Sequence, residues 1–111
     1  MGYRSKVIIG VKSGKLSDEF DEILKKHKFP EDSMYLKIIN DPNDMKTYQF
    51  EEIKWYSTED WYKDIMDYIH KVSEDSDNAY CIGLGEDGQT HDEVGLFWEY
   101  VEQINEINLI N

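Results

Sequence analysis

Candidate chemistry in this sequence is concentrated in one glycine-rich and acidic stretch. Residues 83–88, Gly-Leu-Gly-Glu-Asp-Gly, match the G-x-G-x-x-G spacing of phosphate-binding loops. Such a loop needs a helix directly after it, because the helix N-terminus binds the phosphate. No helical pattern follows this motif, and the carboxylates of Glu86 and Asp87 would repel an anion. The motif is therefore predicted to be a hairpin turn, in which Asp-Gly is the strongest signal.

A second candidate group follows directly, where His91, Asp92 and Glu93 are adjacent. Oxygen-rich clusters of this kind can hold Mg²⁺ or Ca²⁺. Because neighbours on a strand point to opposite faces, only His91 and Glu93 are expected to converge. The three histidines and one cysteine also lack the spacing of a zinc site. No metal and no other cofactor is therefore predicted.

The sequence shows no arrangement that is typical of nucleophilic catalysis. A Ser, His and Asp set, or a Cys and His pair, cannot be recognised from one chain with so few of these residues. Cys81 lies in an apolar run and is interpreted as a core thiol. The leading expectation is a protein that is not an enzyme, and enzymatic activity is kept as a third hypothesis, after the two binding functions given below.

Charge is the dominant global property of the chain. The 111 residues include 24 Asp and Glu against 12 Lys and Arg, which gives a formal net charge of −12. Such a field repels nucleic-acid phosphates and anionic lipids, so direct binding to nucleic acid or to a membrane is not expected. It favours basic partners, although acidity also serves solubility alone. The N-terminus lacks a signal-peptide pattern and no apolar run could span a bilayer, so a cytoplasmic location is expected.

The best candidate for a binding surface combines the second predicted helix with the hairpin at 86–93. Carboxylates spaced like nucleic-acid phosphates, at about 1.7 Å per charge along a duplex, can occupy a basic groove. Aromatic side chains near them would anchor the contact. The predicted partner-binding residues are Glu59, Asp60, Trp61, Asp64, Asp67, Glu86, Asp87, Asp92, Glu93 and Trp98. A generic solvated acidic face is equally compatible with this pattern.

The elements that position these residues follow a recognisable order. Strands are predicted at 3–12, 34–40, 45–56, 79–84 and 89–94, with helices between Ser17 as N-cap and Pro30, and from the caps Ser57 and Thr58 to Val72. The order β-α-β-β-α-β, with additional C-terminal strands, is that of an α+β, ferredoxin-like fold. Its antiparallel sheet would carry both helices on one face.

Two expectations depend on this architecture. The opposite face of the sheet is expected to contact water or to be the site of self-association. The segment 96–109 is compatible with helix or strand, and its aromatic start favours strand. A chain of 111 residues has the usual size of one domain, 1–111.

Three short motifs also suggest a relationship. They are Met1-Gly2-Tyr3-Arg4-Ser5 before an apolar strand, Lys54-Trp55-Tyr56 before the second helix, and Gly85-Glu86-Asp87-Gly88 followed by Asp92, Glu93 and Gly95. With them the chain resembles a family of small, uncharacterised tailed-phage proteins. The resemblance implies a phage accessory protein in a bacterial host cytoplasm and assigns no catalytic residue. The long, apolar-ended C-terminal segment departs from the family.

The leading functional hypothesis combines charge and resemblance. It is an inhibitor that binds the basic surface of a host nucleic-acid-binding protein. The most specific form of this hypothesis is an anti-CRISPR-like anti-defence protein. The alternative is a small-molecule-binding domain that sequesters a signalling nucleotide, with Arg4 or a lysine at the base of a pocket.

Overall fold

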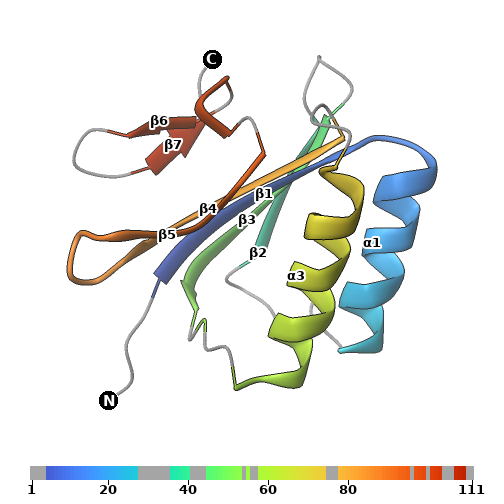
Figure 1. The fold of residues 1–111 in the computed structure, drawn as a ribbon, viewed down its shortest axis with the longest axis horizontal. Helices are drawn as coiled ribbons and strands as arrows, with labels where there is room; N and C mark the ends of the chain where they lie inside the picture. The colour runs from blue at the N-terminus through green and yellow to red at the C-terminus, as the bar shows by residue number, and fades with distance from the viewer. Residues whose placement is uncertain are drawn as a thin grey trace.

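The fold is an α+β arrangement around a five-stranded antiparallel sheet of order β2-β3-β1-β4-β5 (Figure 1). This computed structural model describes residues 5–27, 36–40, 45–53, 55, 58–74, 78–95, 97–99, 101–103 and 107–109. Its elements are β1 (Ser5–Lys12), α1 (Lys15–Lys26), β2 (Leu36–Asn40), β3 (Met45–Ile53), α3 (Asp60–Val72), β4 (Ala79–Gly85), β5 (Thr90–Val94), the 3₁₀ turn η1 (Phe97–Glu99), β6 (Val101–Gln103) and β7 (Ile107–Leu109). The predicted α+β class, with an antiparallel sheet and two helices, is confirmed.

The central strands β1 and β4 are apolar on both faces. In β1, Val7 and Ile9 point to a first core and Ile8 points to a second core on the opposite face of the sheet. All three side chains are fully buried. β1 pairs antiparallel with β3 on one side and with β4 on the other. Since neither face of these strands is polar, each face needs a covering layer.

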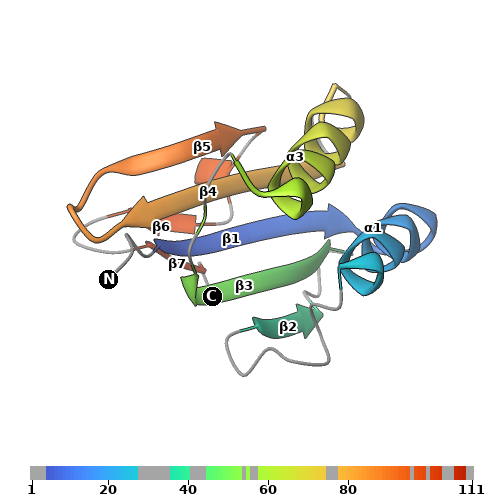
Figure 2. The same ribbon diagram turned by 90° about the horizontal axis from the view of Figure 1, so that it is seen from below.

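Both helices cover the first face and lie on the same side of the sheet (Figure 2). Phe20 and Leu24 of α1 and Ile65 and Ile69 of α3 are buried against the sheet at helical spacing. α1 begins two residues before the predicted cap. Its N-cap is Gly14, whose backbone N–H donates to the Ser17 hydroxyl at 3.0 Å, so Ser17 lies inside the first turn.

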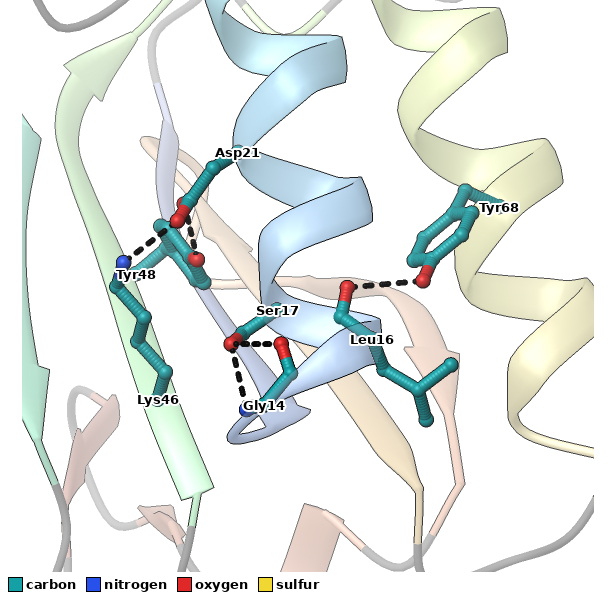
Figure 3. A network of polar contacts seen from close by, with 7 residues as sticks. All are labelled: Gly14, Leu16, Ser17, Asp21, Lys46, Tyr48 and Tyr68. Atoms are coloured by element: carbon teal, nitrogen blue, oxygen red, sulfur yellow. Dashed lines mark hydrogen bonds and ion pairs between the residues drawn. The ribbon is translucent and has the colours of Figure 1, made fainter.

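Polar contacts fix α1 to its neighbours on two sides (Figure 3). Toward the sheet, Asp21 accepts a hydrogen bond from the Tyr48 hydroxyl and forms an ion pair with Lys46 at 2.7 Å. Toward α3, the Tyr68 hydroxyl donates to the Leu16 carbonyl at 2.8 Å. Burial, reinforced by Asp21, raises the pKa of Tyr48 far above its ordinary value, so its hydroxyl stays protonated and remains a donor.

The C-terminal segment covers the second face of the sheet. Ile8, Tyr80 and Ile82 of the sheet form a buried cluster with Val101 of β6 and Ile107 of β7, and Figure 1 shows β6 and β7 opposite the helices. The expectation that the face opposite the helices contacts water or a second copy of the protein is therefore wrong at Ile8, Tyr80 and Ile82, which β6 and β7 cover. Within the predicted segment 96–109, the strand prediction holds for β6 and β7, whereas Phe97–Glu99 forms the turn η1. Residues 96, 100 and 104–106 of this segment lie outside the described residues.

The predicted hairpin turn at 83–88 is confirmed. The Gly85 N–H donates to the Gln89 carbonyl at 3.0 Å, and the Gly88 N–H donates to the Gly85 carbonyl at 3.0 Å. Gly88 has a φ of 78°, a conformation that glycine adopts without strain.

Among the helices of the described residues, none combines the length and apolarity that a membrane crossing requires.

The role of the C-terminal hairpin can be tested with two matched substitutions. Ile107→Ala should lower the free energy of unfolding by about 2–4 kcal/mol, because it removes a fully buried side chain from the second core. Ile38→Ala deletes the same atoms on β2, where the side chain is 43% exposed, and should cost less than about 1 kcal/mol. Urea denaturation measures both values, and equal losses would contradict the assignment of Ile107 to a core.

Candidate functional site

The carboxylate of Asp92 is the centre of the most connected polar site among the described residues. Its Oδ2 accepts hydrogen bonds from Trp55 Nε1 at 3.0 Å and from His91 Nδ1 at 2.7 Å, and its Oδ1 accepts one from the Tyr62 hydroxyl at 2.6 Å. Trp55 follows β3, Tyr62 lies on α3, and His91 lies on β5. One side chain therefore connects the edge of the sheet to the helical layer.

A β-bulge places Asp92 in this position. Cys81 pairs with Val94 and Gly83 with His91, so two residues of β5, Asp92 and Glu93, lie opposite a single residue of β4. Asp92 has a φ of 52°, in the left-handed region that Asp tolerates better than most residues. The bulge turns the side chain of Asp92 toward its neighbour His91.

The expectation that His91 and Glu93 converge is therefore wrong, because the strand does not alternate regularly at this point. Glu93 is exposed and accepts a hydrogen bond from the Thr90 hydroxyl at 3.1 Å. His91 and Asp92 are the pair that the structure brings together.

The ring of His91 lies over a glycine and reaches across β4 to β1. Its Nε2 is 3.0 Å from the hydroxyl oxygen of Ser5. A Cβ added to Gly83 would lie 2.2 Å from the His91 ring, so only glycine leaves this path open. Ser5, His91 and Asp92 thus form a continuous hydrogen-bonded row. Gly83, the first glycine of the G-x-G-x-x-G motif, thus makes room for the ring of His91. The motif does not have phosphate-binding geometry.

Hydrogen-bonding rules fix the tautomer of His91. A carboxylate oxygen can only accept, so Nδ1 carries the proton that bonds to Asp92. In the neutral form of the ring with this tautomer, Nε2 is the acceptor for the Ser5 hydroxyl. Burial by itself raises the pKa of Asp92, but hydrogen bonds from His91, Tyr62 and Trp55 outweigh it, so the pKa lies below its ordinary value of 3.8. Asp92 is therefore ionised at neutral pH.

The tryptophans differ in their exposure. Trp55 is buried, and its ring centroid lies 5.2 Å from that of Trp61 and 5.6 Å from that of Tyr62. Trp55 belongs to the first core, and Trp61 and Tyr62 pack against it. Trp61 is therefore half-buried, and part of its ring contacts the core. Trp98 on η1 is 58% exposed and contacts Phe97 edge to face. Of the two predicted tryptophan anchors, Trp98 offers the larger surface to a partner.

The predicted acidic residues of α3 lie on a surface of mixed charge. Glu59, Asp60 and Asp67 are exposed, and Lys63 and Lys71 are exposed on the same helix. Asp64 contacts Lys26, the last residue of α1, and His27, which follows α1. A hydrogen bond from His27 at 2.8 Å, and a second from Lys26 at 3.2 Å, hold the pKa of Asp64 below its ordinary value.

The negative charge of the chain is strongly segregated along the sequence. All 12 Lys and Arg residues lie at or before Lys71. The stretch 72–111 contains ten carboxylates and no Lys or Arg, so it carries ten of the twelve net negative charges. This stretch supplies β4, β5, η1, β6 and β7. Glu86, Asp87 and Glu93 are exposed on its β4–β5 hairpin, whereas Asp92 is turned inward.

Within the described ranges, no three His, Cys, Asp or Glu side chains come together as a set of metal ligands. Comparison with protein-family models, with curated proteins and with solved structures gives no match for this chain. Two features of the described residues stand out in this region: the hydrogen-bonded row that ends at Asp92, and the acidic β4–β5 hairpin beside it.

Asp92→Asn tests the charge at this centre, because Asn also tolerates a positive φ. The substitution should lower the free energy of unfolding at pH 7 by about 1–3 kcal/mol, since the buried Trp55 and the partly buried Tyr62 and His91 lose their ionised acceptor. The depressed pKa of Asp92 means that this contribution is fully present above a pH of about 4 and is lost as the pH falls through the lower, folded-state value.

Denaturation curves recorded from pH 7 to pH 2.5, a window chosen to span roughly that range, should therefore show the wild type and the variant converging in acid. Asp67→Asn, at an exposed carboxylate of α3, is the control and should change stability by less than about 0.5 kcal/mol at every pH. A wild-type advantage that is the same at both ends of the range would contradict the assigned role of the charge.

Proposed function

We propose that the protein binds a basic surface of another protein, of the kind that otherwise holds nucleic-acid phosphates, and competes with the nucleic acid for it. The observation that carries this proposal is the segregation of charge, with ten carboxylates and no Lys or Arg after residue 71. A field of one sign attracts an oppositely charged partner and speeds its association. Acidity needed only for solubility requires no such separation along the chain.

The β4–β5 hairpin is the part of the predicted surface that best suits this role. Glu86, Asp87 and Glu93 are exposed on it, and no Lys or Arg occurs between 72 and 111. On α3, exposed lysines are interspersed with the carboxylates, and Asp64 forms an ion pair with Lys26 and a hydrogen bond with His27. The acidic residues of α3 would therefore contribute less to the contact than those of the hairpin.

Trp98 supplies an aromatic anchor in the same C-terminal stretch. It lies on η1, which follows β5 and contacts β4. Exposed tryptophans are the side chains that most often dominate the energy of a protein–protein contact. An exposed ring together with a cation-free acidic hairpin supports binding to a protein in preference to simple solvation.

The resemblance to tailed-phage proteins extends this proposal to a biological setting. The protein would then act in the cytoplasm of a bacterial host and inhibit a nucleic-acid-binding host protein, such as a nucleic-acid-guided defence nuclease. The basic groove of such an enzyme has the charge that the hairpin requires. No catalytic step by this chain is needed for inhibition by occupancy.

We also propose that the sheet and its two helices form a ferredoxin-like fold. β1 and β2 flank β3, and β3 and β4 flank β1, so each helix connects two strands with one strand between them. These split β-α-β units support a ferredoxin-like core. β5 would then be an addition at its edge, and β6 with β7 an added layer on its second face.

Two triple variants test the proposed surface. The hairpin variant carries Glu86→Gln, Asp87→Asn and Glu93→Gln, and the helix variant carries Asp18→Asn, Glu22→Gln and Asp67→Asn at exposed positions of α1 and α3. Both remove three charges. In affinity capture from bacterial lysate, the wild type and the helix variant should retain a nucleic-acid-binding protein, and the hairpin variant should bind it at least about tenfold more weakly.

The captured protein must then behave as the proposal requires. Its affinity for the wild type should fall steeply between about 0.01 and 0.15 M salt, over which the range of electrostatic attraction shortens from about 30 to 8 Å. Adding the wild type should release labelled nucleic acid from it. Equal loss in both triple variants, affinity that is indifferent to salt, or a partner that retains its nucleic acid would each contradict the proposal.

A further inference from the structure

Beyond binding, the row formed by Ser5, His91 and Asp92 has the connectivity of a nucleophilic site. The Ser5 hydroxyl oxygen is 3.0 Å from His91 Nε2, and His91 Nδ1 is 2.7 Å from Asp92 Oδ2. Each distance is a normal hydrogen bond, and the carboxylate fixes the tautomer that leaves Nε2 free to accept a proton. A hydroxyl, a base and a group that orients the base are the parts by which such sites are recognised, whatever their order in the chain.

We propose that Ser5 is an activated nucleophile for small carboxylic esters, with His91 as its base and Asp92 as a positioning residue. The Ser5 oxygen bonds to the carbonyl carbon of the ester while its proton passes to His91 Nε2. When the intermediate collapses, the bond to the alcohol breaks and His91 returns that proton to the leaving oxygen. Water then attacks the acyl group on Ser5 by the same route and releases the acid.

The surroundings of the row favour this use over a purely structural one. Asp92 is held by Trp55 and Tyr62 as well as by His91, and its backbone adopts the uncommon left-handed conformation. Conformations of this kind concentrate at functional sites. Gly83 leaves room for the imidazole, which a larger residue would displace. The network thus fixes the ring of His91 in the one orientation that faces Ser5.

Exposure sets a limit on the substrate. The His91 side chain is 26% exposed, so the base can exchange its proton with solvent. Ser5 is only 3% exposed, so only a small acyl group could bring its carbonyl carbon to the hydroxyl. The acidic hairpin beside the site further disfavours anionic esters. Short-chain neutral esters are therefore the class that the site would accept.

The test uses the full chain and a small alkyl fluorophosphonate, which transfers its phosphonyl group to an activated serine and releases fluoride. Intact-mass measurement should show a single adduct on the wild type, and peptide mapping should place it on Ser5. The rate should fall at least about 100-fold in His91→Gln, which keeps an amide in the place of the ring but removes the base, and should also fall in Asp92→Asn. Ser13→Ala, at an exposed serine in the turn after β1, should label like the wild type.

The wild-type result alone can overturn the proposal, so it does not depend on whether a variant folds. An unlabelled wild type, or an adduct mapped to another residue, would refute the role of Ser5. An unchanged rate in a folded His91→Gln variant, as judged by circular dichroism, would refute the role of His91. Neither result would affect the binding function, which rests on the charge of the β4–β5 hairpin.

Discussion

The ionised carboxylate of Asp92 is the interaction on which the arrangement of the site depends. It accepts hydrogen bonds from Trp55, Tyr62 and His91, which come from the end of β3, from α3 and from β5. Hydrogen bonds to a charged acceptor are about twice as strong as neutral ones, and together they offset the cost of a left-handed residue in a strand. Without this acceptor, the buried Trp55 and the partly buried Tyr62 and His91 would lose a shared partner, and the edge of the sheet would lose this polar connection to α3.

A second constraint explains why the chain folds back onto the sheet after β5. Because β1 and β4 are apolar on both faces, the helices cover one face and the chain after β5 must return to cover the other. Val101 and Ile107 supply the apolar contacts of that second layer. This segment contains three Glu and no Lys or Arg, so the layer that completes the second core extends the acidic part of the sequence.

Patterns of apolar residues were sufficient to predict the class, the two helices and the β4–β5 hairpin, since these depend on local periodicity and turn chemistry. The site was not predictable in the same way. Regular alternation placed His91 and Asp92 on opposite faces, and only a bulge, which depends on pairing with β4, brings them together. The contact of Ser5 with His91 joins residues 86 positions apart. One signal in the sequence was usable, namely that Gly83 interrupts an apolar strand and so indicates a close approach by another group.

The proposed binding surface and the row formed by Ser5, His91 and Asp92 meet at β5, where Glu93 is exposed and the partly buried Asp92 contacts Trp55. The central claim is that the Asp92 carboxylate fixes both the position and the tautomer of His91. Long-range ¹H–¹⁵N NMR correlation of the His91 imidazole at neutral pH reads that tautomer directly. The account predicts a ring protonated on Nδ1 with an unprotonated Nε2 facing Ser5. A ring protonated on Nε2, or one that averages between both forms, would contradict it.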